Sequence, residues 1–133
     1  MSEPVFPPIE AIIDIHAEVL EAHGGAPGLR DRGALEASLA RARQVLAYDG
    51  KTSVSDLAAA ICIGICRNHP FVDGNKRVAF AALGIMLGLI GLALDTTERD
   101  ATRVIYKLAA GRLSETKFRA WVQANTGPDE TVS

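Results

Sequence analysis

Apolar residues recur along most of this chain at the spacing of amphipathic helices, and short polar or glycine-containing breaks separate the runs. One stripe covers residues 9–20 and stops at a Gly-Gly pair, and similar patterns cover residues 31–46 and 53–66. A longer apolar run spans residues 78–94, and two shorter patterns follow at 98–110 and 114–125. The pattern predicts an all-α, compact bundle of about six helices around a buried central helix, which the run at 78–94 would supply.

Residues suited to cap helix N-termini stand before several of these segments. They are Asp31, Ser53 or Ser55, Thr96 or Thr97, and Ser114. Short extended pieces are expected near residues 48–51 and 92–95, and the polar residues 126–133 are expected to form a flexible tail. The length of 133 residues predicts a single domain over residues 1–133.

Composition narrows the class of protein. The run at 78–94 is shorter than the roughly 20 residues that a membrane span needs and contains Gly84, Gly88 and Gly91, so we interpret it as a core helix and expect no membrane partner. The formal net charge of −2 argues against direct binding of nucleic acid, which favours a basic face. No basic segment precedes an apolar run at the N-terminus, so a cytoplasmic location is expected.

Two cysteines, Cys62 and Cys66, lie four positions apart in an apolar helical segment. A disulfide within one helical turn has poor geometry, and zinc prefers four tetrahedral ligands. We therefore interpret both as buried free thiols, which suits a reducing compartment, rather than as metal ligands.

The polar stretch HPFVDGNKR, residues 69–77, carries the candidate chemistry. It ends where the apolar run begins, and the first N–H groups of a helix lack internal partners and point at whatever binds there. The backbone N–H groups of Gly74, Asn75 and Lys76 would cradle a phosphate, and the side chains of Lys76 and Arg77 add positive charge. This stretch therefore predicts an anion site.

Two further side chains in the same stretch suit phosphoryl transfer. Asp73 is a carboxylate that can hold Mg²⁺, and His69 can act as a general base, because histidine is the side chain that most often serves this role near neutral pH. The expected ligands are thus ATP and Mg²⁺, with Asp73 as the metal ligand. The alternative for His69 taken alone is a helix cap or an exposed imidazole. We expect Phe71 to anchor the loop in the core and His16, on an apolar stripe, to lie in the core or behind the site.

The stretch at 69–77 resembles the signature H-x-F-x-[D/E]-[G/A]-N-[G/K]-R of the Fic/Doc family. The segments IH at 15–16, HGGAPG at 23–28 and DRGALEA at 31–37 are also similar to the Doc branch of that family, the death-on-curing toxins of toxin–antitoxin pairs. The resemblance covers roughly residues 9–125. It implies a Fic/Doc fold, His69 as base, Asp73 on the metal, and Asn75 and Arg77 on phosphates.

Two residues distinguish the branches of that family. Nucleotidylating Fic enzymes usually carry Gly at the position of Lys76 and a second Arg at the position of Phe80. Lys76 therefore resembles the Doc branch, in which ATP is understood to bind in the reverse sense. The resemblance implies a protein kinase that transfers the γ-phosphate to a hydroxyl of a cellular protein, by analogy a translation elongation factor, and so arrests growth. The alternatives are an AMP transferase and a catalytically idle helical binding module.

The restraint of such a toxin is also implied by the resemblance. Some Fic proteins carry an inhibitory [S/T]-x-x-x-E-[G/N] helix, and the nearest match here is residues 126–131. That segment ends in Thr131, and Gly127-Pro128 is incompatible with a helix interior. Restraint is therefore expected from a separate Phd-like antitoxin.

Overall fold

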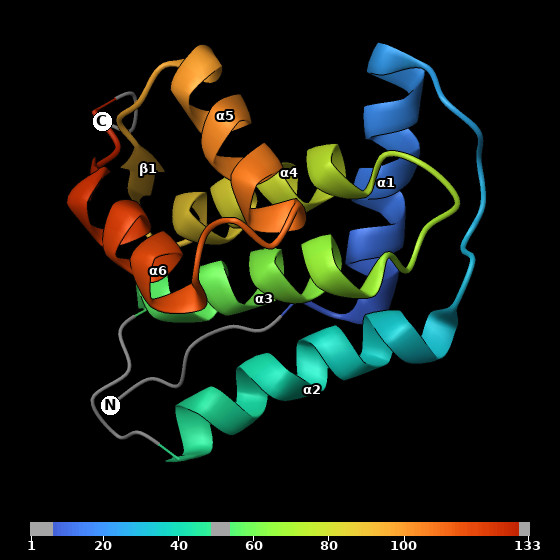
Figure 1. The fold of residues 1–133 in the computed structure, drawn as a ribbon, viewed down its shortest axis with the longest axis horizontal. Helices are drawn as coiled ribbons and strands as arrows, with labels where there is room; N and C mark the ends of the chain where they lie inside the picture. Colours follow the sequence, from blue (N-terminus) through green and yellow to red (C-terminus); the bar gives the residue numbers. More distant parts are fainter. Residues whose placement is uncertain (1–6, 49–53, 131–133) are drawn as a thin grey trace.

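The computed structural model describes residues 7–48 and 54–130 of the chain, and these residues form six helices and two short strands (Figure 1). The elements are α1 (Ile9–His23), α2 (Arg32–Tyr48), α3 (Val54–Asn68), α4 (Asn75–Gly88), β1 (Leu92–Leu94), α5 (Glu98–Ala109), α6 (Glu115–Ala124) and β2 (Thr126–Pro128). The predicted all-α bundle of about six helices is therefore confirmed.

Helix α3 lies at the centre of the bundle. It packs against α2 on one side and α4 on the other, and α5 and α6 also contact it (Figure 1). Every residue from 55 to 66 is buried apart from Ala60, which is partly buried. A helix that is apolar all round must be enclosed on all sides, which explains this position.

The apolar run at 78–94, expected to form the central helix, forms most of α4, the turn that follows it and strand β1. Helix α4 buries one face, which includes Val78, Ala82 and Leu83, against the core. Ile85 on this helix and Leu89 directly after it are exposed. The core is thus shared between α3 and α4, and α3 is the more completely enclosed of the two. Along residues 7–48 and 54–130, no helix combines the length and apolarity that crossing a membrane would require.

Three of the predicted caps are confirmed by hydrogen bonds. The carboxylate of Asp31 accepts from the Ala34 N–H at 3.0 Å, and Thr97 Oγ1 accepts from the Asp100 N–H at 3.1 Å. Ser114 Oγ accepts from the Lys117 N–H, also at 3.1 Å. Each cap satisfies a backbone donor that has no partner inside its helix, which fixes the start of α2, α5 and α6. Of the two cap candidates for α3, Ser55 is wrong because it lies inside the helix, which begins at Val54, and Ser53 lies outside the described residues.

The two strands correct the expectation for the C-terminal residues. Residues Thr126–Pro128, expected to belong to a flexible tail, form β2 and pair antiparallel with β1. The pair is extended by hydrogen bonds from the Asp95 N–H to Asn125 O and from the Asp129 N–H to Gly91 O. The extended piece expected at 92–95 is thereby confirmed, whereas Tyr48 belongs to α2 and residues 49–51 lie outside the described residues. This pairing returns the chain after α6 to the end of α4.

Candidate functional site

The motif at residues 69–77 forms the connection between α3 and α4, and its last three residues are the first turn of α4. Gly74 precedes the helix with φ 76°, a left-handed conformation that glycine adopts without steric cost. Among the residues that the structure describes, no group accepts a hydrogen bond from the backbone N–H of Asn75, Lys76 or Arg77. The helix start therefore presents open donors, as an anion site requires.

The carboxylate of Asp73 is fixed by two backbone donors. Its Oδ2 accepts from the Ala26 N–H at 3.1 Å and its Oδ1 from the Gly74 N–H at 2.8 Å. These two hydrogen bonds, Ala26 first, lower the pKa of Asp73 against a smaller opposing effect of desolvation, and the charges of Arg77 and His16 lower it further. Asp73 is thus an exposed, ionised carboxylate beside the helix start. Its bond to Gly74 also means that this N–H, expected to cradle a phosphate, is already occupied.

Asp73 suits a magnesium ion carried in by a phosphate ligand. Within the described residues, no group of three or more His, Cys, Asp or Glu side chains could hold a metal by itself. Mg²⁺ commonly binds through one or two carboxylates together with substrate phosphate oxygens. A single ionised carboxylate next to open helix N–H groups fits that mode.

The side chain of Asn75 holds the motif together. Its Oδ1 accepts from the Phe71 N–H at 2.9 Å, and its Nδ2 donates to the Phe71 carbonyl at 3.0 Å. Phe71 is 1% exposed, so it anchors the loop in the core as predicted. The amide of Asn75 is therefore engaged with the main chain, and what it presents to a ligand is its backbone N–H.

His16 of α1 contacts the motif from behind. Its ring is 4% exposed and stacks on the Phe71 ring with centroids 3.9 Å apart and planes 10° apart. Its Nε2 lies 2.8 Å from the Asp73 carbonyl, and since a carbonyl only accepts, Nε2 carries the proton in this contact. His16 thus supports the loop, in agreement with the expectation that it lies in the core or behind the site.

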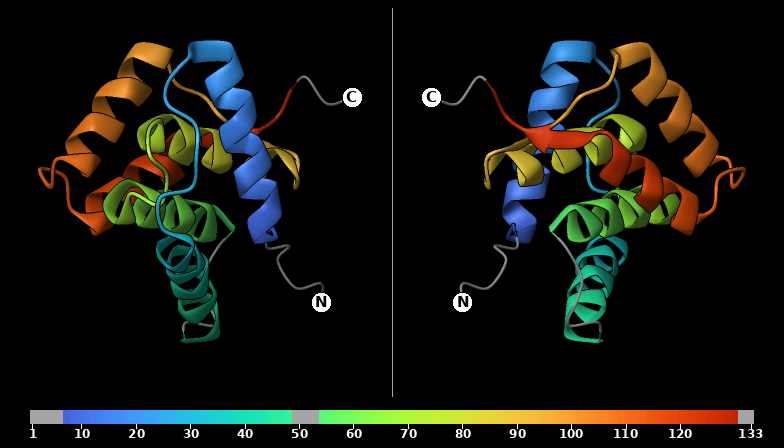
Figure 2. Two further views of the ribbon diagram at one scale, coloured as in Figure 1. Left: turned by 90° about the vertical axis from the view of Figure 1, so that its right-hand side faces the viewer. Right: turned by 90° about the vertical axis from the view of Figure 1, so that its left-hand side faces the viewer.

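The segment between α1 and α2 runs beside the motif, as Figure 2 shows. Leu29 pairs with Phe71 in an isolated antiparallel bridge. The Val72 N–H donates to Gly28 O at 3.0 Å, and the Arg30 N–H donates to Pro70 O at 2.8 Å. The Gly-rich segment was expected to end the first helix and resembles the Doc branch, but this pairing was not predicted, since pairing between two distant loops has no local sequence pattern.

His69 lies at the C-terminal end of α3 and its side chain is exposed. Its φ of 47° is left-handed, which is uncommon for a residue other than glycine. The side chain of Arg30 reaches the same place, where Nε donates to His69 O at 2.7 Å and an Nη donates to Asn68 O at 2.9 Å.

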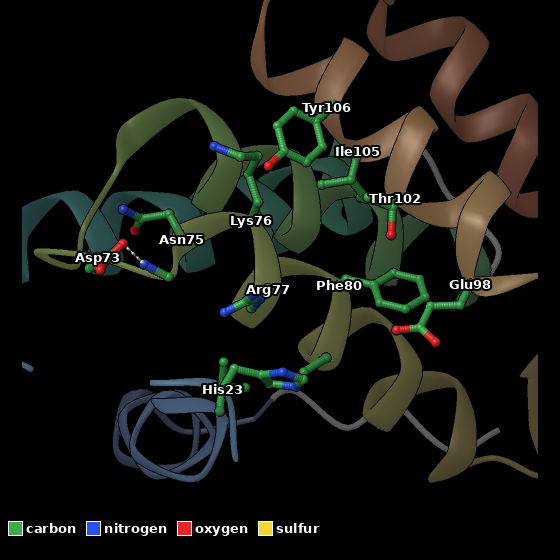
Figure 3. A pocket seen from close by; sticks show the side chains of 13 residues that line it. His23, Asp73, Asn75, Lys76, Arg77, Phe80, Glu98, Thr102, Ile105 and Tyr106 are labelled. Carbon is green, nitrogen blue, oxygen red and sulfur yellow. Dashed lines mark hydrogen bonds between the residues drawn. The ribbon is translucent and has the colours of Figure 1, made fainter. Parts of the chain in front are cut away.

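A cavity of about 670 Å³ opens beside the start of α4, between α1 and α5 (Figure 3). Asp73, Gly74, Asn75, Lys76 and Arg77, all predicted from the motif, line one part of it. His69 is not among the lining residues. The structure therefore brings the predicted phosphate and metal residues together at one cavity and leaves the predicted base at its own exposed position.

The part of the cavity wall that α5 supplies was not foreseen, whereas the family resemblance singles out Phe80. Helix α5 contributes Glu98, Thr102 and Tyr106, and Phe80 of α4 forms part of the floor (Figure 3). The ammonium of Lys76 lies 5.0 Å from the centroid of the Tyr106 ring, within cation–π range. Nothing in the sequence near α5 resembles a motif, so only the packing of α5 against α4 identifies these residues.

The two cysteines are free thiols in the core. The hydrogen bond between the thiols, together with burial, raises the pKa of Cys62, and the same hydrogen bond lowers the pKa of Cys66. Their positions agree with the interpretation as buried thiols inside α3.

Comparison with known proteins agrees with the motif. A model of the Fic/DOC family matches residues 6–87, more than half of the chain. The chain is 42% identical over 74 residues to "Toxin Doc" of Mycolicibacterium smegmatis, covering 55% of this chain and 57% of that protein. It is 34% identical over 70 residues to "Protein kinase doc" of Escherichia phage P1, covering 53% of this chain and 56% of that protein. The matched part thus spans little more than half of each relative, and the chain belongs to the Fic/DOC family.

Proposed function

We propose that this member of the Fic/DOC family is the toxin of a toxin–antitoxin pair and acts as a protein kinase in the cytoplasm. It would transfer the γ-phosphate of Mg²⁺–ATP to a Ser or Thr hydroxyl of a cellular protein, by analogy a translation factor, and so arrest growth. The observation that carries the proposal is the set of open N–H groups at the start of α4, with Asp73, Lys76 and Arg77 around one part of a cavity of about 670 Å³. The name of the phage relative, "Protein kinase doc", supports the choice of reaction.

The cavity suits a nucleotide in size and in the distribution of polarity. Small-molecule pockets commonly measure roughly 300–1,000 Å³ and combine apolar walls with a few polar groups. Here the cations and open N–H groups lie at the start of α4, and Phe80, Ile105 and Val19 supply apolar wall. Phosphates would bind the first turn of α4, and the remainder of the nucleotide would occupy the rest of the cavity.

In the proposed reaction, each residue has one task. His69 would accept the proton of the incoming hydroxyl, whose oxygen would attack the γ-phosphorus while the bond to the β,γ-bridging oxygen breaks and ADP leaves. Lys76 and Arg77 would neutralise the charge that spreads over the phosphate oxygens, and Asp73 would hold Mg²⁺, which supplies further charge neutralisation. Since the His69 side chain is exposed and does not line the cavity, a hydroxyl on a folded protein can reach it without entering the cavity.

Lys76 and Phe80 favour γ-phosphate transfer over nucleotidyl transfer. Lys76 extends along the wall of the cavity toward Tyr106, so charge and bulk occupy space that a glycine would leave empty (Figure 3). Phe80 lines the cavity without any charge that could hold a terminal phosphate. These two side chains support binding of ATP with its γ-phosphate, rather than its α-phosphate, toward His69.

Restraint by a separate antitoxin is part of the proposal. The segment nearest to a Fic inhibitory helix contains Thr126–Pro128, which forms strand β2 rather than a helix. Residues 126–130, the part of this segment that the structure describes, therefore form no inhibitory helix, which supports restraint by a partner such as a Phd-like protein.

Labelled ATP separates the candidate functions. The purified chain is incubated with cell lysate and Mg²⁺, with ATP labelled at the γ- or the α-phosphate, and compared with a His69→Ala variant. Label from γ-labelled ATP alone, absent with the variant, is the expected result. Transfer of label from α-labelled ATP alone would indicate an AMP transferase instead of a kinase. Transfer of neither label would indicate a catalytically idle binding module. Induction in cells should arrest growth for the wild-type chain and not for His69→Ala.

A further inference from the structure

We infer that Arg30 is a positioning residue that holds the main chain of His69 in the conformation needed for transfer. The inference rests on the proposed role of His69 as the base. It follows from two hydrogen bonds of one guanidinium group, from Arg30 Nε to His69 O at 2.7 Å and from an Arg30 Nη to Asn68 O at 2.9 Å.

The main chain at His69 needs such support because its conformation is sparsely populated. Its φ is 47°, and the residue that follows is Pro70, which disfavours helical conformations in the residue before it and pushes that residue toward an extended one. Such a conformation persists only where neighbouring groups determine it. The His69 N–H donates to Ile65 O at 3.2 Å, and its carbonyl accepts from Arg30, so both polar atoms of its main chain are engaged.

Arginine suits this place for two reasons. The carbonyls of Asn68 and His69 lie at the C-terminal end of α3, where helix carbonyls lack internal donors and a positive charge is favourable. The planar guanidinium can donate to two carbonyls at once, which the single ammonium of lysine does less well. The main chain of Arg30 is itself fixed to the motif, because its N–H donates to Pro70 O at 2.8 Å.

The hydrogen bonds of the Arg30 side chain to His69 O and Asn68 O position the main chain and are not part of an ion pair. Arg30 is exposed, and among the described residues it forms no ion pair with a carboxylate. Arg32, two residues further on, is also exposed but bonds to Glu10 and Glu36. Arg32 therefore provides a matched control, an exposed arginine at the start of α2 whose side-chain partners lie outside the motif.

The experiment compares Arg30→Ala, Arg30→Lys and Arg32→Ala with the wild-type chain in two measurements. The first is nuclear magnetic resonance of the His69 main chain, in which the alpha-carbon shift and the coupling between amide and alpha protons report φ. The second is steady-state transfer of the γ-phosphate, with kcat and KM for ATP determined separately. We expect Arg30→Ala to change the His69 signals and lower kcat about 10- to 100-fold, with KM for ATP within about 3-fold. For Arg30→Lys we expect His69 signals and a kcat between those of Arg30→Ala and the wild type, and Arg32→Ala should match the wild type in both.

The outcomes separate this inference from the proposed function. Unchanged His69 signals in Arg30→Ala, or an unchanged kcat in an active enzyme, would overturn the inference, and so would a raised KM with constant kcat. If the wild-type chain transfers no phosphate, the proposed function fails and the resonance measurement alone decides whether Arg30 holds His69. If Arg30→Ala does not fold, the same criteria apply to Arg30→Lys, which keeps the charge.

Discussion

Replacing Asn75 by alanine should destabilise the chain through the loop rather than through a lost phosphate contact. The variant removes both hydrogen bonds to Phe71 and leaves the N–H and the carbonyl of that buried residue without partners. Leaving a buried polar group unsatisfied costs about 1–3 kcal/mol. The better helix propensity of alanine returns about 0.5 kcal/mol. Because two groups of Phe71 lose their partners, we expect the free energy of unfolding to fall by about 1.5–5.5 kcal/mol, a large share of the roughly 5–15 kcal/mol of a typical domain.

Urea denaturation measures this loss, and the KM for ATP is determined on the same preparations at a temperature where the variant is folded. The control is Gln44→Ala, which removes an exposed carboxamide from α2 and should change the free energy of unfolding by less than about 0.5 kcal/mol. Asn75→Asp keeps an acceptor for the Phe71 N–H and sets a second oxygen against the Phe71 carbonyl, so an intermediate loss is expected. An Asn75→Ala variant with wild-type stability and a raised KM would refute the reasoning, because the amide would then serve the phosphate.

Three further predictions concern the same loop. The hydrogen bonds that lower the pKa of Asp73 stabilise the fold above the ordinary aspartate pKa of about 3.9, and this contribution is lost as the pH falls through the lowered value. The difference in melting temperature between the wild type and Asp73→Asn should therefore shrink below about pH 4. A difference that stays constant with pH would contradict this prediction. Gly25→Ala would place a Cβ 2.9 Å from Asp73 Oδ2 at a φ of 124°, so the free energy of unfolding, measured by thermal denaturation, should fall by about 1–3 kcal/mol. In the control Gly88→Ala, the added Cβ has no atom within 4 Å, so this variant should be neutral or stabilising. Lys76→Gly should lower the rate of γ-phosphate transfer at least about 100-fold. The double variant Lys76→Gly with Phe80→Arg should permit transfer of label from α-labelled ATP. A wild-type rate of γ-phosphate transfer by Lys76→Gly would show that Lys76 has no part in the proposed site.

The helices could be predicted because their signals are local. Apolar spacing identified all six, and the side chains of Asp31, Thr97 and Ser114 marked the starts of α2, α5 and α6. The motif likewise located the loop and helix start that line the cavity, because its functional residues stand close together in the sequence. The strand Thr126–Pro128 was missed because a three-residue pairing depends on a partner more than thirty positions away.

The supports of the site could not be predicted for the same reason. Arg30 has no feature in sequence that distinguishes it from Arg32, and only the hydrogen bonds of its side chain to His69 and Asn68 set the two apart. His16 gave a partial signal, since a polar residue on an apolar stripe must find a partner when buried. Tyr106 gave none, because its role depends on how α5 packs over Lys76.

The pairing between the segment after α1 and the motif restricts which substitutions related sequences can carry at the paired positions. The donors are mainly main-chain N–H groups, those of Ala26, Arg30, Asp31 and Val72, and every amino acid except proline supplies one. Exchanges of side chains at Ala26 and Val72 should therefore be tolerated and should show little covariation with the positions that they contact. The signature of this contact among related sequences should be the exclusion of proline at these positions, and a proline scan of the segment would reveal it experimentally.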